Sequence, residues 1–252
     1  MELSGKTALV TGGAKRIGRR IALRLAENGV NVCFSYRHSR DESRRTLEEL
    51  RSLGVRTCAI QADLTDIDQC DRLLLELGKT TGAIDILVNN ASDFMRTPLE
   101  DLDRDQSLFL DTFETLFKIH VRAPFYLSLR LGIRMKEQGW GRIINITDRA
   151  VARAQAYRNH SLYLASKYAL FGVTQTLAVE LAPEVLVNSV APGFVIAPPH
   201  YSEAKTDRLL QKIPLQREAG SGEIAGDVLH LILAEFKTGS WIVSDGGEGV
   251  IS

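Results

Sequence analysis

The sequence predicts an α/β protein in which one parallel sheet is covered by helices on both faces. Short β-type runs alternate with helical patterns along almost the whole chain, the order expected of a doubly wound sheet. The runs are apolar throughout, as strands are when both of their faces are buried. A glycine-rich turn separates the first run from the first helical pattern. We therefore expect a single domain spanning residues 1–252, with no linker, repeat or low-complexity tract.

Each expected element follows from its own pattern. Seven apolar runs are expected to form strands, at residues 7–10, 31–34, 57–60, 84–88, 142–146, 186–190 and 240–243. Helical patterns lie between these runs, for example at residues 17–27, 42–53, 108–137 and 162–181. Residues 94–106 and 194–214, the latter containing Ala197-Pro198-Pro199, fit neither pattern. They follow strands at the carboxyl edge of the sheet, where open α/β folds bind ligands, so we interpret them as substrate loops; inert connectors are the alternative.

Composition excludes several classes of function. The chain carries 31 Lys and Arg against 31 Asp and Glu, so it lacks the positive charge of a nucleic-acid-binding protein. No apolar run approaches the roughly 20 residues of a membrane span, and residues 1–6 show no signal-peptide pattern. Cys33, Cys58 and Cys70 lack metal-site spacing, and their odd number disfavours a disulfide framework. We expect a cytoplasmic protein with reduced thiols, a small-molecule substrate, and no metal or membrane contact.

The turn after the first strand has the pattern of a pyrophosphate site. It reads Thr11-Gly12-Gly13-Ala14-Lys15-Arg16-Ile17-Gly18, with Gly12 placed for a tight turn and Gly18 for close approach of the first helix. Free N–H groups and the positive dipole at the start of that helix would then face a dinucleotide. A glycine turn alone is a weak signal, and its position between strand and helix strengthens it.

The end of the second strand indicates which dinucleotide is bound. Folds that bind NAD place a carboxylate there for the ribose 2′-hydroxyl, but this chain has no acid before Asp41. Arg37 can form a fork to a 2′-phosphate instead, with Lys15 and Arg16 in the neighbouring turn. The sequence therefore predicts NADPH rather than NADH as the cofactor. Solvated surface charge is the alternative for any one of these side chains.

A tyrosine and a lysine share one face of a long helical pattern. Tyr163 and Lys167 stand four residues apart, about one helical turn. A phenol with an ordinary pKa of about 10 transfers protons poorly near neutrality, and an adjacent ammonium group favours its ionised form. We interpret the pair as an acid–base unit beside the dinucleotide, with Tyr163 as the proton donor. A chance pair on a solvated helix is the alternative.

Six ordered motifs make the chain resemble the short-chain dehydrogenase/reductase family over essentially its whole length. They are Thr11-Gly12…Gly18, Asp63-Leu64, Asn89-Asn90-Ala91, Tyr163-x-x-x-Lys167, Pro192-Gly193 and Asp245-Gly246-Gly247. The resemblance implies a Rossmann-type sheet of seven strands, hydride transfer with NAD(P)(H), and commonly a homotetramer. It places Asp63 at the adenine amino group, and it places Lys167 on the nicotinamide ribose, where it would lower the pKa of Tyr163. Further cofactor contacts are implied for Leu64, Asn90, Ala91, Pro192 and Gly193.

Three positions depart from the usual family pattern. Arg16 stands where the turn has a second glycine, and His120 replaces the usual helix asparagine. Asp148 occupies the position of the catalytic serine, three residues after Asn145. The departures at Arg16 and Asp148 are shared with the pteridine reductase branch of the family, which the chain resembles most strongly before Asp148.

The resemblance to this branch extends to further residues. It includes Tyr36-Arg37-His38-Ser39, expected at the cofactor, and Ser92-Asp93-Phe94 after the fourth strand. In that branch the aromatic matching Phe94 stacks on the pterin, and the residues matching Ser92 and Arg16 touch ligand or phosphate. The loop from Asp148 to Tyr163 is longer than the family pattern. It brings four basic residues near the entrance, where they would meet an acidic substrate tail or solvent: Arg149, Arg153, Arg158 and His160.

An aspartate beside the proton donor favours one substrate chemistry. A serine hydroxyl can donate to a ketone oxygen that gains negative charge as hydride arrives, whereas an ionised Asp148 would repel that oxygen. A pterin instead presents ring and exocyclic N–H groups, which a carboxylate accepts, and its C=N bond needs a proton on nitrogen. We therefore expect an NADPH-dependent pteridine reductase, with Asp148 having no chemical role as the alternative.

Two other functions stay open. One is a carbonyl reductase, including the 3-oxoacyl carrier-protein type, with Asp148 protonated or uninvolved. The other is a catalytically silent NADP(H)-binding module that senses redox state and binds a partner. His120 favours the silent module, and the intact pair Tyr163 and Lys167 argues against it.

Overall fold

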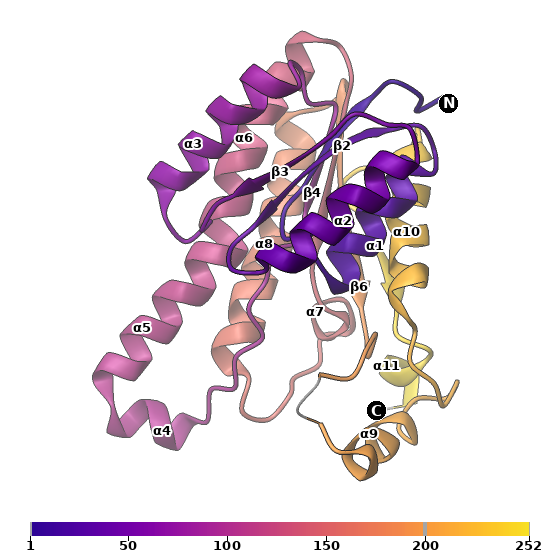
Figure 1. Ribbon diagram of the computed structural model, residues 1–252. Coiled ribbons are helices and arrows are strands. Elements are labelled where there is room, and N and C mark those ends of the chain that lie inside the picture. The colour runs from indigo at the N-terminus through magenta and orange to yellow at the C-terminus, as the bar shows by residue number, and fades with distance from the viewer. Residues whose placement is uncertain (1, 199–200, 252) are drawn as a thin grey trace.

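The protein contains one seven-stranded parallel sheet of the Rossmann type, as predicted (Figure 1). The structure is a computed structural model that describes residues 2–198 and 201–251, so Pro199 of the second predicted loop lies outside the described residues. The sheet has the order β3-β2-β1-β4-β5-β6-β7. The strands are β1 (Thr7–Val10), β2 (Asn31–Tyr36), β3 (Thr57–Gln61), β4 (Ile86–Asn89), β5 (Gly141–Ile146), β6 (Val185–Pro192) and β7 (Trp241–Ser244).

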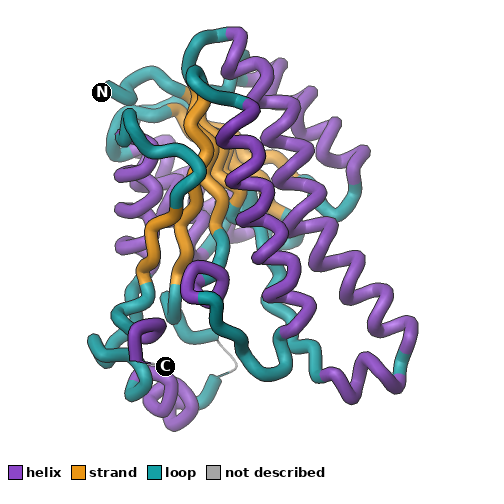
Figure 2. Tube along the Cα trace, turned by 180° about the vertical axis from the view of Figure 1, so that it is seen from behind, coloured by secondary structure: helices purple, strands orange, loops and turns teal. Residues whose placement is uncertain are grey.

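Helices cover both faces of the sheet (Figures 1 and 2). On one face lie α1 (Arg16–Ala26), α2 (Arg40–Ser52) and α10 (Ser221–Leu233), and on the other α3 (Ile67–Thr80), α6 (Ala123–Glu137) and α8 (Ser161–Glu180). Alternate strand residues face opposite layers: Ala8 and Val10 of β1 pack into the first core, and Leu9 packs into the second. The strands are apolar throughout because both of their faces are buried.

The chain changes its direction of travel across the sheet at β1. From β1 it runs outward through β2 and β3, and then returns so that β4 pairs with the other side of β1. The loops that follow β1 and β4 therefore lead away from each other at the carboxyl ends of these strands, which is where open α/β sheets bind ligands. Thr11 follows β1 and Asn90 follows β4 at this point.

Three segments differ from the sequence prediction in their local conformation. The predicted loop 94–106 contains α4 (Leu99–Arg104), and the predicted loop 194–214 contains α9 (Glu203–Leu210). The predicted helix 108–137 consists of α5 (Gln106–Phe117), a π-helical turn η1 (Lys118–Arg122) and α6. The sequence did not reveal these short helices because the polar residues that are common in loops also cap the first turn of a helix. Ser202, for example, caps α9 by accepting from the Lys205 amide.

A buried polar network ties the central strands to the helices behind them. Asn89 at the end of β4 donates to Asn145 Oδ1 of β5 at 2.8 Å, and also to Ser128 Oγ of α6 at 3.2 Å. Asn145 in turn donates to Thr174 Oγ1 of α8 at 2.9 Å. Because all four side chains are buried, breaking one bond would leave an unpaired polar group away from water. The network therefore fixes the strand ends from which the site is built.

Two of the three cysteines are paired, contrary to the expectation of reduced thiols. Cys33 in β2 and Cys58 in β3 lie opposite each other in the parallel register, with their Cα atoms 4.6 Å apart, and form a disulfide. Cys70 is a free, buried thiol. The pairing follows from the register of two neighbouring strands, which the spacing of the cysteines along the sequence did not indicate.

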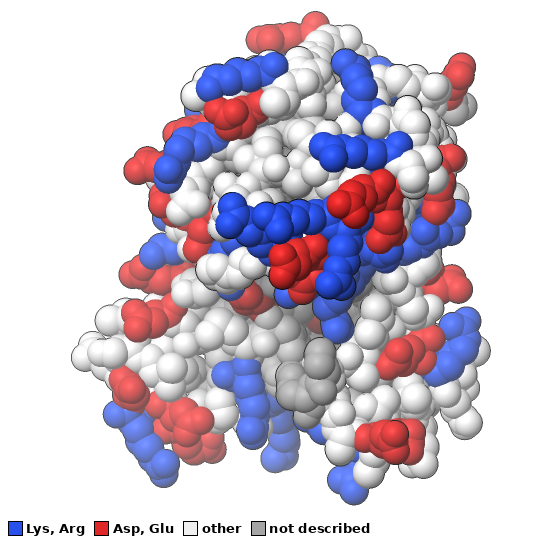
Figure 3. Space-filling view, viewed as in Figure 1, with Lys and Arg blue, Asp and Glu red and all other residues white. Residues whose placement is uncertain are grey.

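Charges of both signs are mixed on the surface. Figure 3 shows lysine and arginine side chains interleaved with aspartate and glutamate, in keeping with their equal numbers. Within residues 2–198 and 201–251, no helix combines the length and the apolar character that crossing a membrane requires.

Candidate active site

The glycine turn after β1 is fastened to the end of β4. Thr11 Oγ1 accepts hydrogen bonds from the backbone N–H groups of Asn90 at 2.9 Å and Ala91 at 3.0 Å. The Asn90 amide nitrogen donates back to Thr11 O at 2.9 Å and to Gly12 O at 3.2 Å. These four bonds hold the two loops of the switch point against each other, so the start of α1 has one defined position.

Close packing explains the glycines of this turn. Gly12 has a φ of +65°, which favours glycine, and a Cβ on Gly18 would lie 2.2 Å from Gly12 O and 2.5 Å from Asn90 Nδ2. Arg16, at the position where the family usually has glycine, also adopts a positive φ of 52°. Its guanidinium group donates to Ile196 O at 2.9 Å and so connects the turn to the segment after β6.

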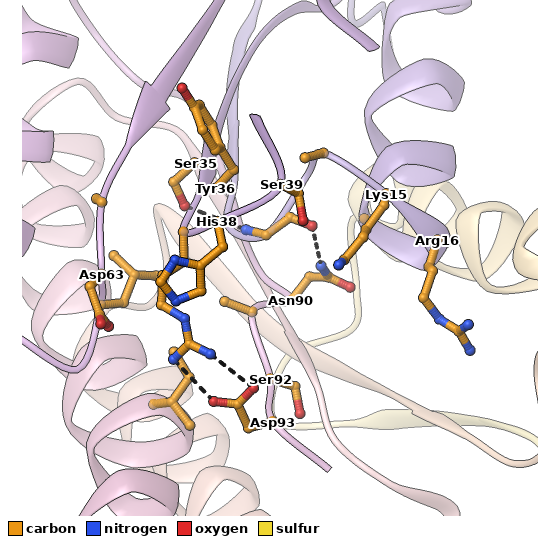
Figure 4. Close-up of a pocket in the computed structure, with 18 of the residues that line it drawn as sticks. Lys15, Arg16, Ser35, Tyr36, His38, Ser39, Asp63, Asn90, Ser92 and Asp93 are labelled. Carbon is orange, nitrogen blue, oxygen red and sulfur yellow. Dashed lines mark hydrogen bonds and ion pairs between the residues drawn. The ribbon is translucent and has the colours of Figure 1, made fainter. Parts of the chain in front are cut away.

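A cavity of about 320 Å³ lies against this turn (Figure 4). In the close-up, Lys15 and Arg16 lie on the α1 side and Asp63 lies on the opposite side, with Ser92 and Asp93 between them at the lower edge. Most residues predicted to bind the cofactor line this cavity, namely Gly12, Lys15, Arg16, Ile17, Gly18, Tyr36, Arg37, His38, Ser39, Asp63, Leu64, Asn90 and Ala91. Ser92, predicted to contact substrate, also lines it.

The remaining predicted cofactor residues lie outside the cavity lining. Thr11 is buried and supports the turn, and Tyr163 and Lys167 lie on α8. Pro192 ends β6, and Gly193 packs against the terminal segment, since a Cβ there would lie 2.8 Å from Asp245 Cα. Five other residues of the lining were not assigned to the site from the sequence, although Ala14 and Asp93 lie inside quoted motifs: Ala14, Ser35, Ala62, Asp93 and Ile119.

Arg37 is paired within the cavity. Its guanidinium nitrogens face the two carboxylate oxygens of Asp93 at 3.3 and 3.5 Å, as the dashed lines in Figure 4 show. Both side chains are about one-third exposed, so water weakens the ion pair. An anion with more charge than one carboxylate could therefore draw Arg37 away from Asp93.

Asp148 lies at the centre of the candidate catalytic residues. It lies at the end of β5 and caps the short helix α7 (Arg149–Arg153) by accepting from the Ala150 N–H at 2.8 Å. The Tyr163 hydroxyl donates to Asp148 Oδ2 at 3.1 Å, and the Tyr157 hydroxyl donates to Oδ1 at 2.7 Å. Tyr157 was not predicted; its only signal was that it lies in the lengthened loop before α8.

The surroundings of Tyr163 keep its hydroxyl protonated. Burial and the neighbouring Asp148 carboxylate raise the pKa of Tyr163 well above its ordinary value. This net shift is opposite to the lowering expected from Lys167, whose ammonium donates to Ile146 O at 2.9 Å and lies 5.8 Å from the Tyr163 ring centroid. Burial lowers the pKa of Lys167 itself to about 8, although Asp148 opposes that shift. Tyr163 therefore keeps its proton at neutral pH in this structure.

An aromatic residue packs against Tyr163. Phe94 is 53% exposed, stacks on His160 with ring centroids 4.6 Å apart, and meets the Tyr163 ring edge-on at 4.8 Å. The segments carrying Phe94 and His160 are joined where Thr97 N donates to Asn159 O at 2.5 Å. A flat ligand that reaches Tyr163 would consequently pack against the Phe94 ring.

Two of the four basic residues expected at the entrance are engaged elsewhere. Arg149 is buried and pairs with Glu248 of α11 (Glu248–Ile251) at 2.6 Å, and Arg153 pairs with Asp245 at 3.3 Å. They fasten the loop that carries Tyr157 to the terminal segment. Arg158 is exposed, and His160 stacks on Phe94.

The fold and the site define a class of protein. A glycine turn at the switch point of a parallel sheet is typical of α/β folds that bind a dinucleotide. The profile of the short chain dehydrogenase family matches residues 6–208, and the chain belongs to this family.

Several relatives resemble the chain over nearly its whole length. The 3-oxoacyl-acyl-carrier-protein reductase FabG of Staphylococcus epidermidis is 34% identical over 250 residues, which cover 96% of this chain and 98% of the relative. The solved structure of FolM alternative dihydrofolate reductase 1 from Brucella canis, complexed with NADP, matches with a TM-score of 0.89 and 31% identity, covering 100% of this chain and 96% of that one. A blue fluorescent protein from a metagenomic library, in complex with NADPH, matches with a TM-score of 0.88 and 34% identity, covering 98% and 99% of the two chains.

The buried ammonium of Lys167 predicts a pH dependence of stability. Between pH 8 and its ordinary pKa of 10.5, the unfolded chain binds the Lys167 proton and the folded protein does not, so the free energy of unfolding rises with pH. Because the folded lysine is already half deprotonated at pH 8, we expect the unfolding free energy of wild type minus that of Lys167→Met to rise by about 1.5 kcal/mol from pH 8 to pH 9.5. Urea denaturation at both pH values measures it, and parallel pH profiles for the two proteins would contradict the assignment.

Proposed function

We propose that this protein is an NADPH-dependent reductase that transfers hydride to the C=N bond of a pteridine, with Tyr163 as proton donor. The observation that carries the proposal is the carboxylate of Asp148 beside the Tyr163 hydroxyl. Asp148 Oδ1 accepts from Ala150 and Tyr157, whereas Tyr163 is the donor to Oδ2 among the described residues. A carboxylate oxygen accepts two hydrogen bonds, so Oδ2 has room for one ligand N–H.

The residues of the cavity fit NADPH. The tight packing at Gly18 leaves the backbone of the turn open to a pyrophosphate at the start of α1. Lys15, Arg37 and His38 line the cavity, and residues 36–39 contain no acid, which suits a 2′-phosphate. Asp63 uses Oδ1 to bind Thr65, which leaves Oδ2 for the adenine amino group.

The catalytic residues would deliver one proton while NADPH supplies the hydride. Tyr163 gives its hydroxyl proton to the ring nitrogen of the reduced bond, and the nearby Lys167 ammonium offsets the negative charge left on the phenolate oxygen. Asp148 accepts a ring or exocyclic N–H and so holds the ligand in register with Tyr163. Phe94 packs on the flat face of the heterocycle.

The carbonyl reductase remains the second candidate function. It is favoured by the 34% identity to the 3-oxoacyl-acyl-carrier-protein reductase of Staphylococcus epidermidis. The Asp148 carboxylate argues against it, because a negative charge next to Tyr163 would repel a developing alkoxide. The NADP-bound FolM alternative dihydrofolate reductase 1 of Brucella canis supports the pteridine proposal, since its name states activity on a reduced pteridine.

The proposal includes a homo-oligomer. Helices α5 and α6 expose a row of large apolar side chains, which a second copy of the chain could cover, at Leu108, Phe109, Leu110, Phe113, Phe125, Leu129 and Ile133. The homotetramer and the cytoplasmic location expected from the sequence stay predictions.

Cofactor choice gives a direct test of the basic residues. We expect the unmodified protein to bind NADPH about tenfold to a hundredfold more tightly than NADH, because Arg37 exchanges Asp93 for the 2′-phosphate. Arg37→Ala should abolish most of this preference and leave NADH binding unchanged, whereas Asp93→Ala should strengthen NADPH binding. The exposed Arg51 of α2 supplies the control variant Arg51→Ala. Titrations at equal ionic strength that show equal affinities for the two cofactors would contradict the assignment.

Variants of Asp148 and Phe94 test the substrate. Asp148→Ser should lower turnover of a dihydropterin and leave ketone reduction equal or better, because the repelling charge is replaced by a donor. Phe94→Ala should raise the Michaelis constant for pterins by about two- to tenfold more than Phe94→Leu, which keeps apolar bulk without an aromatic face. Steady-state kinetics with NADPH measure both effects. The carbonyl reductase predicts no pterin-selective loss in either variant.

A further inference from the structure

A buried histidine connects the cavity lining to the helix that carries the proton donor. His120 lies in η1 with no exposed surface. Its Nε2 is 2.7 Å from Ser92 Oγ, and its Nδ1 is 2.8 Å from Ser166 Oγ on α8. Its ring also meets the Tyr163 ring edge-on, with centroids 5.6 Å apart. The histidine therefore contacts both the cavity lining, through Ser92, and the helix α8, through Ser166.

Counting the protons fixes the direction of each bond. Ser166 Oγ lies 2.7 Å from Tyr163 O, and because a carbonyl can only accept, the single hydroxyl proton of Ser166 is used there. The Ser166 oxygen must then accept from His120, so Nδ1 carries a proton. All three groups are buried, so no water can supply another partner.

The histidine is neutral, and this determines that Nε2 carries no proton. Burial, with a smaller contribution from the nearby Lys167 ammonium, lowers the pKa of His120 to about 2. A neutral imidazole carries one proton, so Nε2 has a lone pair and accepts the hydroxyl proton of Ser92. Ser92, whose side chain lines the cavity, then presents lone pairs alone to a ligand.

We propose that His120 is a positioning residue that makes Ser92 an obligate hydrogen-bond acceptor, and that Ser92 selects a heterocycle carrying an amino group. The selected ligand class rests on the proposed function. An acceptor of this kind favours an amino group, disfavours a carbonyl oxygen at the same position, and cannot donate to a phosphate of the cofactor. With this assignment His120 acts in substrate choice, so its presence no longer favours a catalytically silent binding module.

A matched pair of ligands tests the selection. The 2-amino-4-oxo dihydropterin and its 2-oxo counterpart differ in one exocyclic group. The NADPH-bound protein should bind the amino form about tenfold or more tightly, because the 2-oxo oxygen and the Ser92 oxygen are both acceptors and cannot form a hydrogen bond with each other. Ser92→Ala should bring the two affinities within about threefold of each other. His120→Phe keeps the ring volume and frees the Ser92 proton, so it should also remove the preference although Ser92 is intact. Retention of the full preference in both variants would overturn the selection.

The tautomer is measured separately on the unmodified protein. Nitrogen-15 NMR of the imidazole rings should show one of the five histidines, the one whose signal is lost in His120→Phe, protonated at Nδ1 and unchanged between pH 5.5 and pH 8.5. A signal protonated at Nε2, or one that titrates in this range, would overturn the role of His120 even if the variants misfold. If the tautomer is as expected and neither dihydropterin binds, the proposed function fails and the ligand class fails with it, while the fixed polarity of Ser92 stands.

Discussion

The carboxylate of Asp148 organises the catalytic half of the site, since three separate elements donate to it. The donors are the Ala150 N–H in the first turn of α7, the Tyr157 hydroxyl in the lengthened loop, and the Tyr163 hydroxyl on α8. A negative charge at this position raises the pKa of Tyr163 and so keeps its proton in place. In the proposed function this charge also selects the substrate, because a carboxylate beside Tyr163 accepts N–H groups and repels oxyanions.

The cofactor half depends on a different constraint, the topology of the sheet. The reversal at β1 makes β1 and β4 neighbours, so the loops after them start side by side before they diverge, and the bonds between Thr11 and Asn90 fasten these loop starts together. The start of α1, from Arg16 to Gly18, lines the cavity there. The two halves meet at His120, which bonds to Ser92 on the cavity side and to Ser166 on α8. Binding at the cavity is thereby coupled in space to the helix that presents Tyr163.

Local patterns predicted much of the fold and of the cavity. The seven strands follow from buried apolar runs, and the lining from Gly12 to Ala91 follows from motifs placed at strand ends. What the sequence could not predict depends on how distant segments meet. The bond from Tyr157 to Asp148 needs the path of a loop, the pairing of Arg37 with Asp93 needs the distance across the cavity, and the disulfide needs strand register. The effect of Lys167 on Tyr163 was misjudged because burial and Asp148 outweigh it.

The most direct measurement of the central claim is the oxidation of NADPH by the unmodified enzyme with a panel of substrates under one set of conditions. The panel contains dihydrobiopterin, dihydromonapterin and dihydrofolate on one side, and simple ketones and an acetoacetyl thioester on the other. If Asp148 selects N–H-bearing heterocycles as proposed, NADPH is consumed steadily with at least one pteridine and slowly with every carbonyl compound. Ready reduction of the thioester or the ketones, with no turnover of any pteridine, would contradict the account.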